Sequence, residues 1–297
     1  MKPANLKTTH PSFRSKIFLD GGDPEETKKL IETLGFLDGQ TTNPTLISKN
    51  PEAAKRLAEG QKFSKEEIFD FYKEVVKEIS GLIPGGSVSV EVYADANTTA
   101  EEMFTQGKDM YTWIPNAHVK YPTTKVGLEA AEKSIKEGMK VNMTLVFSQA
   151  QAAAVYSATK GALRGQVFVS PFVGRLDDRG ENGMDLVKNI LKMYESSDGH
   201  VEVLTASLRN MEHLLYGLSL GSDIITAPFK LLDEWVKKKM PIPELNSYSY
   251  NSANLRPIEY KVLDLNGSWD EFDVNHALTD SGIEKFSTDW NGLIQRI

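Results

Sequence analysis

The chain of 297 residues lacks cysteine altogether. That absence excludes disulfide bonds, thiol nucleophiles and metal sites built on thiolates. Histidine is scarce as well, and its five copies (His10, His118, His200, His213 and His276) show neither metal-ligand spacing nor an HExxH pattern, so we expect no metal ion. No GxGxxG motif follows the first expected strand, so nothing indicates a bound dinucleotide.

Positive charge is also in short supply. Lysine and arginine number 34 against 41 acidic residues, which leaves a net charge of −7. The one basic run, 237–239, falls at an expected helix end, where lysines oppose the negative end of the helix dipole. A nucleic-acid-binding protein needs a basic face, so this balance favours a small-molecule ligand.

Long hydrophobic runs are missing too. No stretch approaches the length that crosses a bilayer, so we expect no membrane segment. The tail at residues 1–15 mixes Lys, Thr, Pro and Ser without a continuous apolar core and does not have the pattern of a signal peptide. The expected location is the cytoplasm.

What the chain does contain is an alternation of short β-branched runs and amphipathic helices over residues 16–240. The expected strands are 16–20, 36–41, 87–93, 118–120, 139–147, 166–172, 200–206 and 223–226. Eight such units in this length favour an α/β fold of the closed (β/α)₈ TIM-barrel type over an open doubly wound sheet.

The segment 241–297 has a different character. After Pro241-Ile242-Pro243 it is rich in Asn, Ser and Tyr, which indicates an irregular extension along the surface. Near its end, 279–282 can cap a helix over 283–294 with an apolar face. We expect that face to pack on the chain's own barrel or on a neighbouring subunit.

Lys120 stands where the expected strand 118–120 opens into a loop. A lysine at a strand end is most often a solvated charge. One held in an apolar pocket can instead supply a neutral amine, which attacks a carbonyl to form a Schiff base. The residue alone does not decide between the two, so its neighbours in the fold matter.

A TIM barrel builds its site where strands end and loops begin. Several polar residues occupy such positions: Asp20, Asn43, Glu91, Lys120, Asn142, Thr144, Ser170, Arg175, Ser207 and Arg209. Each has a structural explanation as a loop cap, a turn former, a satisfied core polar group or a solvated charge. Together they predict one mouth that holds acids, an amine, amides and arginines.

These residues also fall within recognisable motifs. They are Asp20, TTNPTLI at 41–47, Glu91, VKYP at 119–122, NMTLVFS at 142–148, SPFVGR at 170–175 and ASLRN at 206–210. Their order and spacing resemble the transaldolase family over residues 16 to about 230, and LTDSGIEKF at 278–286 is similar to the end of longer family members. Seven motifs in register make this resemblance specific.

The resemblance implies a class I mechanism without a cofactor. Lys120 is expected to attack the C2 carbonyl of a ketose phosphate, while Glu91 and Thr144 hold the water through which protons move. Asp20 is expected to take the proton of the C4 hydroxyl as the C3–C4 bond breaks. A dihydroxyacetone unit then stays on Lys120 until an aldose phosphate accepts it, as in the pentose phosphate pathway.

The resemblance also implies the substrate contacts. Asn43, Asn142 and Ser170 are expected to bind the hydroxyls of the dihydroxyacetone unit. Arg175, Arg209 and Ser207 are expected to hold the substrate phosphate, a task suited to guanidinium groups. Phe172 belongs to the expected apolar wall near Lys120. The expected ligands are therefore sugar phosphates, and we expect a homo-oligomer.

Two positions bear on the subfamily. Relatives that act as fructose 6-phosphate aldolases resemble this chain but carry Gln at the Glu91 position and Tyr at the Phe172 position, so both residues favour a transaldolase. Tyr121-Pro122 after the lysine is closer to the aldolase-like branch, and Gly21-Gly22 differs from the longer enzymes. An aldolase that releases free dihydroxyacetone, a transferase for a ketose with another anionic head group, and a non-catalytic sugar-phosphate-binding barrel are the alternatives.

Overall fold

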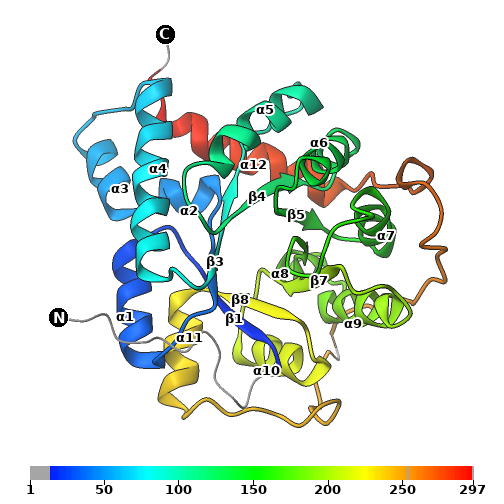
Figure 1. Ribbon diagram of the computed structural model, residues 1–297. Helices are drawn as coiled ribbons and strands as arrows, with labels where there is room; N and C mark the ends of the chain where they lie inside the picture. The colour runs from blue at the N-terminus through cyan, green and yellow to red at the C-terminus, as the bar shows by residue number, and fades with distance from the viewer. Residues whose placement is uncertain (1–13, 253, 296–297) are drawn as a thin grey trace.

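Eight parallel strands close into a barrel in the order β1 to β8 (Figure 1). The computed structural model describes residues 14–252 and 254–295, so most of the expected tail at 1–15 lies outside the described residues. The strands are β1 Lys16–Asp20, β2 Gly39–Thr41, β3 Ser87–Glu91, β4 Ala117–Pro122, β5 Val141–Val146, β6 Val167–Pro171, β7 Val201–Thr205 and β8 Ile224–Ala227. Pairing of β1 with β8 closes the ring, which confirms the expected TIM barrel.

Helices surround this barrel (Figure 1). They are α1 Pro24–Leu34, α2 Pro44–Ser48, α3 Pro51–Ala58, α4 Lys65–Leu82, α5 Ala100–Tyr111, α6 Lys125–Lys136, α7 Gln149–Ala158, α8 Val173–Asp177, α9 Gly183–Tyr194, α10 Met211–Leu220, α11 Phe229–Lys237 and α12 Ala277–Leu293. Local signals explain several starts: the Asp23 carboxylate accepts from the Glu25 N–H at 2.9 Å, and Ser64 and Glu67 form a capping box on α4. None of the helices in the described ranges is long and apolar enough to cross a membrane.

Aromatic rings fill the barrel interior below the site. His118 of β4 stacks on Phe168 of β6 with centroids 4.0 Å apart, and Phe18 of β1 meets the same ring at 6.0 Å. Because these strands are not neighbours, the contacts cross the interior. Gly39 leaves room for this layer, since a Cβ there would lie 2.5 Å from the Phe18 ring. Strand side chains alternate, so the residues two positions further along also face inward; these are Asp20, Thr41, Lys120 and Ser170.

Several expected strand ends differ from those in the structure. The strand that carries Lys120 continues through Tyr121 and Pro122, so the lysine lies within the sheet rather than at its last residue. Pro122 is compatible with a strand end because a ladder hydrogen bond from its nitrogen is not needed there. Residues 36–38 do not join β2, and residues 173–177, which include the end of the SPFVGR motif, form the short helix α8.

The last helix also begins earlier than expected. α12 starts at Ala277, where the His276 ring accepts from the Leu278 N–H at 3.2 Å, so 279–282 lie inside the helix instead of capping it. Phe286, Trp290 and Leu293 of the predicted apolar face are buried, Ile294 after the helix end is half-buried, and Trp290 packs on Phe69 at 5.2 Å. α12 lies against α2 and the end of β5 of the same chain. The other described residues of the extension are irregular except for a short 3₁₀ turn at Trp269–Glu271.

Candidate active site

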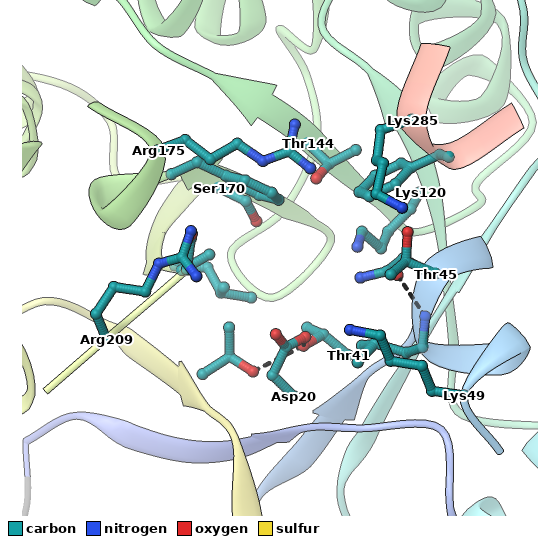
Figure 2. A pocket seen from close by; sticks show the side chains of 18 residues that line it. Asp20, Thr41, Thr45, Lys49, Lys120, Thr144, Ser170, Arg175, Arg209 and Lys285 are labelled. Atoms are coloured by element: carbon teal, nitrogen blue, oxygen red, sulfur yellow. Dashed lines mark hydrogen bonds between the residues drawn. The ribbon is translucent and has the colours of Figure 1, made fainter. Parts of the chain in front are cut away.

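A cavity of about 300 Å³ opens at the C-terminal end of the barrel strands. Its wall contains nine of the eleven residues expected at the site: Asp20, Asn43, Lys120, Thr144, Ser170, Phe172, Arg175, Ser207 and Arg209. Glu91 and Asn142 lie behind this wall, in contact with residues that form it. The side chains of Figure 2 converge on one space from strands, helices and loops around the mouth of the barrel.

Lys120 and Glu91 form a buried pair. The Lys120 Nζ lies 2.9 Å from Glu91 Oε2 and donates to the Thr42 carbonyl at 3.1 Å. Only 2% of Lys120 and 4% of Glu91 are exposed. Burial raises the pKa of Glu91, while the charges of Lys120 and Arg175 oppose that rise. A carboxylate with a raised pKa beside an ammonium group can accept its proton.

Asp20 closes β1 and faces the cavity. Its carboxylate accepts from the Thr41 hydroxyl at 2.8 Å, and Thr41 in turn lies 2.7 Å from the Thr226 hydroxyl. The surrounding protein desolvates the carboxylate and raises the pKa of Asp20, against the opposing effects of Lys120, Thr41 and Lys49. A hydroxyl chain on one side and a cavity on the other suit this acid to proton transfer with a bound alcohol.

Asn142 acts through Ser170 instead of lining the cavity. The Ser170 hydroxyl donates to Asn142 Oδ1 at 2.6 Å, and the Asn142 amide donates to the Ser89 hydroxyl at 3.0 Å. This chain fixes the direction of the Ser170 side chain. Thr144 differs, because its buried hydroxyl has no hydrogen-bond partner among the described residues although it lines the cavity. Such a group costs free energy when unpaired, so Thr144 is suited to hold a water or substrate atom.

Two arginines occupy one side of the cavity, as Figure 2 shows. Arg175 projects from α8, and Arg209 lies in the loop before α10, where it pairs with Asp178 at 3.0 Å. The Gly174 N–H donates to the Ser207 carbonyl at 2.9 Å and thereby joins α8 to that loop. Gly174 is required, because a Cβ there would lie 2.5 Å from the Ser207 backbone carbonyl oxygen as well as 2.3 Å from the Arg209 Nε. Burial lowers the pKa of Arg175.

Known proteins resemble this chain over nearly its whole length. The sequence matches the family described as Transaldolase/Fructose-6-phosphate aldolase over residues 17–297. The chain belongs to this family. It is 36% identical over 278 residues to a protein of Dehalococcoides mccartyi named "Probable transaldolase", which covers 94% of this chain and 99% of that protein. The predicted membership is therefore confirmed.

Further relatives carry the same name. A "Probable transaldolase" of Methanococcus maripaludis is 35% identical over 281 residues, covering 95% of this chain and 100% of that protein. A protein of the same name from Alkaliphilus metalliredigens is 34% identical over 280 residues, and the match covers 94% of this chain and 100% of that protein. The chain is thus an enzyme of the transaldolase family, matched along nearly its whole length.

The cavity of this transaldolase-family barrel includes residues that the sequence reasoning missed. Lys49 follows α2, and Lys285 and Phe286 belong to α12. In Figure 2 the two lysines lie on the side opposite the arginines. The family-like motif at 278–286 carried a signal for the α12 residues. No such signal pointed to Lys49, since α2 has only five residues and begins at an Asn-Pro pair that suits a turn equally well.

Charge is distributed unevenly between the cavity and the whole chain. Five cations line the cavity, against one acid, Asp20; the cations are Lys49, Lys120, Arg175, Arg209 and Lys285. The whole chain carries a net charge of −7. Three of these cations, Lys120, Arg209 and Lys285, pair with the acids Glu91, Asp178 and Asp289 outside the lining. The lining nevertheless has an excess of positive charge, which favours an anionic ligand at this mouth. Within the described ranges no cluster of three or more His, Asp or Glu residues could hold a metal ion.

Proposed function

We propose that the chain is a transaldolase that transfers a dihydroxyacetone unit between sugar phosphates through a Schiff base on Lys120. The donors are fructose 6-phosphate or sedoheptulose 7-phosphate, and the acceptors are erythrose 4-phosphate or glyceraldehyde 3-phosphate, as in the pentose phosphate pathway. The observation that carries the proposal is the buried Lys120–Glu91 pair, 2.9 Å apart, behind a cavity that also contains Asp20 and two arginines. Buried ion pairs contribute little to stability, so a chemical role explains this one better.

The first step joins the lysine to the substrate. Lys120 gives a proton to Glu91, whose raised pKa favours that transfer, and the neutral amine attacks the C2 carbonyl of the ketose. Protonation of the resulting carbinolamine hydroxyl by Glu91 releases water and leaves the protonated imine. The unpaired hydroxyl of Thr144 holds the water that leaves and later returns.

The second step breaks the carbon chain. Asp20 accepts the proton of the C4 hydroxyl, the C4 oxygen becomes the carbonyl of the departing aldose phosphate, and the C3–C4 electron pair moves into the protonated imine. The resulting enamine of dihydroxyacetone stays on Lys120. It attacks the carbonyl carbon of an acceptor aldose, whose oxygen recovers the proton from Asp20, and hydrolysis releases the new ketose.

The remaining residues orient the substrate. Asn43 uses its side-chain oxygen to cap α2, accepting from the Leu46 N–H at 2.9 Å, so its amide N–H groups serve the bound hydroxyls. Ser170, held by Asn142, binds the C1 end. Arg175, Arg209 and Ser207 bind the phosphate, and Phe172 excludes water beside them.

Borohydride trapping tests this function. After incubation with fructose 6-phosphate and reduction, intact mass and peptide mapping should show one dihydroxyacetone-derived adduct on Lys120, and the Lys120→Met variant should fold without forming it. No adduct on the wild-type enzyme would falsify the Schiff-base mechanism. Turnover that requires erythrose 4-phosphate indicates a transferase, whereas steady release of free dihydroxyacetone without an acceptor indicates the aldolase alternative.

Assembly and location stay predictions. Light scattering after size-exclusion chromatography tests the expected homo-oligomer, and a monomer at micromolar concentration contradicts it. A cytoplasmic location fits the proposed substrates.

A further inference from the structure

Helix α12 reaches the guanidinium of Arg175 at two points. The Phe286 ring centroid lies 5.4 Å from the guanidinium carbon, and the Phe172 centroid lies 5.6 Å from it. Gly282 lies one turn earlier on α12, and a Cβ there would come within 2.8 Å of Arg175 Nη1 and 2.7 Å of a Leu145 methyl group. The helix therefore approaches the arginine as closely as a glycine permits.

Arg175 depends on these contacts for its position. Among the described residues its guanidinium makes no hydrogen bond or ion pair, whereas one nitrogen of the Arg209 guanidinium pairs with the exposed Asp178 carboxylate at 3.0 Å. Aromatic rings hold a guanidinium through its flat faces and leave its N–H edge free. A carboxylate partner would occupy that edge. The two rings thus orient Arg175 and leave the N–H groups of its guanidinium available to bind a phosphate.

An irregularity in β5 holds α12 in this place. The register of β5 shifts between Met143 and Val146, and Leu145 adopts a left-handed conformation with φ of 58°. Its carbonyl accepts from the Thr279 hydroxyl of α12 at 2.9 Å, and Thr279 accepts from the Gln151 amide at 2.8 Å. The C-terminal extension is therefore fixed to the strand that also carries Thr144.

We propose that Phe286 and Gly282 of α12 are positioning residues that orient Arg175 toward the substrate phosphate and so set the preference for phosphorylated sugars. This inference rests on the proposed function, because it assigns Arg175 to the phosphate. It goes further in making the C-terminal extension a specificity element of the cavity.

Phe286→Leu tests the role of the ring. Leucine keeps an apolar contact but removes the aromatic face, so the KM for fructose 6-phosphate and the inhibition constant of inorganic phosphate should each rise about five- to tenfold. The kcat should change far less than either constant. Borohydride trapping with unphosphorylated fructose supplies the neutral comparison, and its half-saturation should shift much less than that of fructose 6-phosphate.

Gly282→Ala tests the close approach independently of the ring. Its methyl group displaces Arg175 Nη1, so the phosphate inhibition constant should rise in the same direction. Gly292→Ala is the matched control, because a Cβ at this α12 position meets nothing within 4 Å. Phe69→Leu is a second control, since it removes a ring from Trp290 of α12, 5.2 Å away, and should lower Tm without selective loss of phosphate binding.

The outcomes separate the two proposals. A wild-type enzyme without a Lys120 adduct overturns the proposed function. An adduct together with unchanged phosphate inhibition in both Phe286→Leu and Gly282→Ala overturns the inference on α12. Equal losses for fructose and fructose 6-phosphate overturn it as well, because they indicate a general structural effect.

Discussion

The carboxylate of Asp20 is retained at a cost to the fold. Burial raises its pKa, so the native state binds the proton of this group more tightly than the unfolded chain does. A raised folded-state pKa means that the contribution to stability is fully present below the unfolded pKa and is lost as pH rises through the folded pKa. At neutral pH the ionised group therefore opposes folding.

Asp20→Asn should consequently raise Tm at pH 7 while abolishing C3–C4 cleavage. Each kcal/mol that the substitution adds to the free energy of unfolding should raise Tm by roughly 2–4 °C for a domain of this size. The gain should shrink at pH values below the ordinary range of an aspartate, where the wild-type carboxyl is already protonated. Thermal melts of both proteins across pH check this, and a Tm gain equal at every pH contradicts the assignment.

At the level of single residues, the sequence predicted which residues belong to the site better than it predicted where each of them lies within it. Alternation along each strand sufficed to bring Asp20, Lys120 and Ser170 to the same end of the barrel. It did not show that Asn142 lies behind Ser170, since that depends on the stagger between β5 and β6. The Lys120–Glu91 contact likewise depends on the register Glu91↔Lys120, which no pattern within one strand encodes.

At the level of elements, the strong capping signals identified their helices and the weak ones did not. α4 has a complete capping box, formed by Ser64 and Glu67, which marks its start in the sequence. α8 has no side-chain cap and only five residues, and α12 begins at a histidine cap, an uncommon choice. The early start matters for function, because it places Thr279 and Gly282 inside the helix, where both contact Leu145.

Thr279→Val should loosen α12 from the barrel. The substitution keeps the shape of the side chain but removes the hydroxyl between the Leu145 carbonyl and the Gln151 amide, both buried. Loss of a buried partner costs about 1–3 kcal/mol, so Tm should fall and the amides of α12 should exchange faster. Thr288→Val makes the same change at an exposed position of α12 and should leave both measurements near wild type. Equal exchange in the two variants contradicts the docking role.

At the level of the whole molecule, the negative net charge gave no indication that the site is positively charged. A chain with a net charge of −7 gathers five cations around one cavity, and Lys49 and Lys285 reach it from opposite ends of the sequence. Composition favoured a small-molecule ligand over nucleic acid but did not reveal this local excess of positive charge, because folding alone brings α2 and α12 together. Anions should therefore be attracted to the mouth despite the overall repulsion.

Binding of phosphorylated substrates should accordingly depend on salt. The Debye length falls from ~10 Å at 0.1 M to ~3 Å at 1 M ionic strength, so kcat/KM for fructose 6-phosphate should drop severalfold over that range. Lys49→Gln and Lys285→Gln should lower kcat/KM at low salt and flatten its salt dependence, because each removes part of the attracting charge. Lys237→Gln is the control, since this lysine lies in the last turn of α11, at the other end of the barrel, and its side chain is 73% exposed. If all three variants keep the wild-type slope, the two cavity lysines do not act on the incoming phosphate.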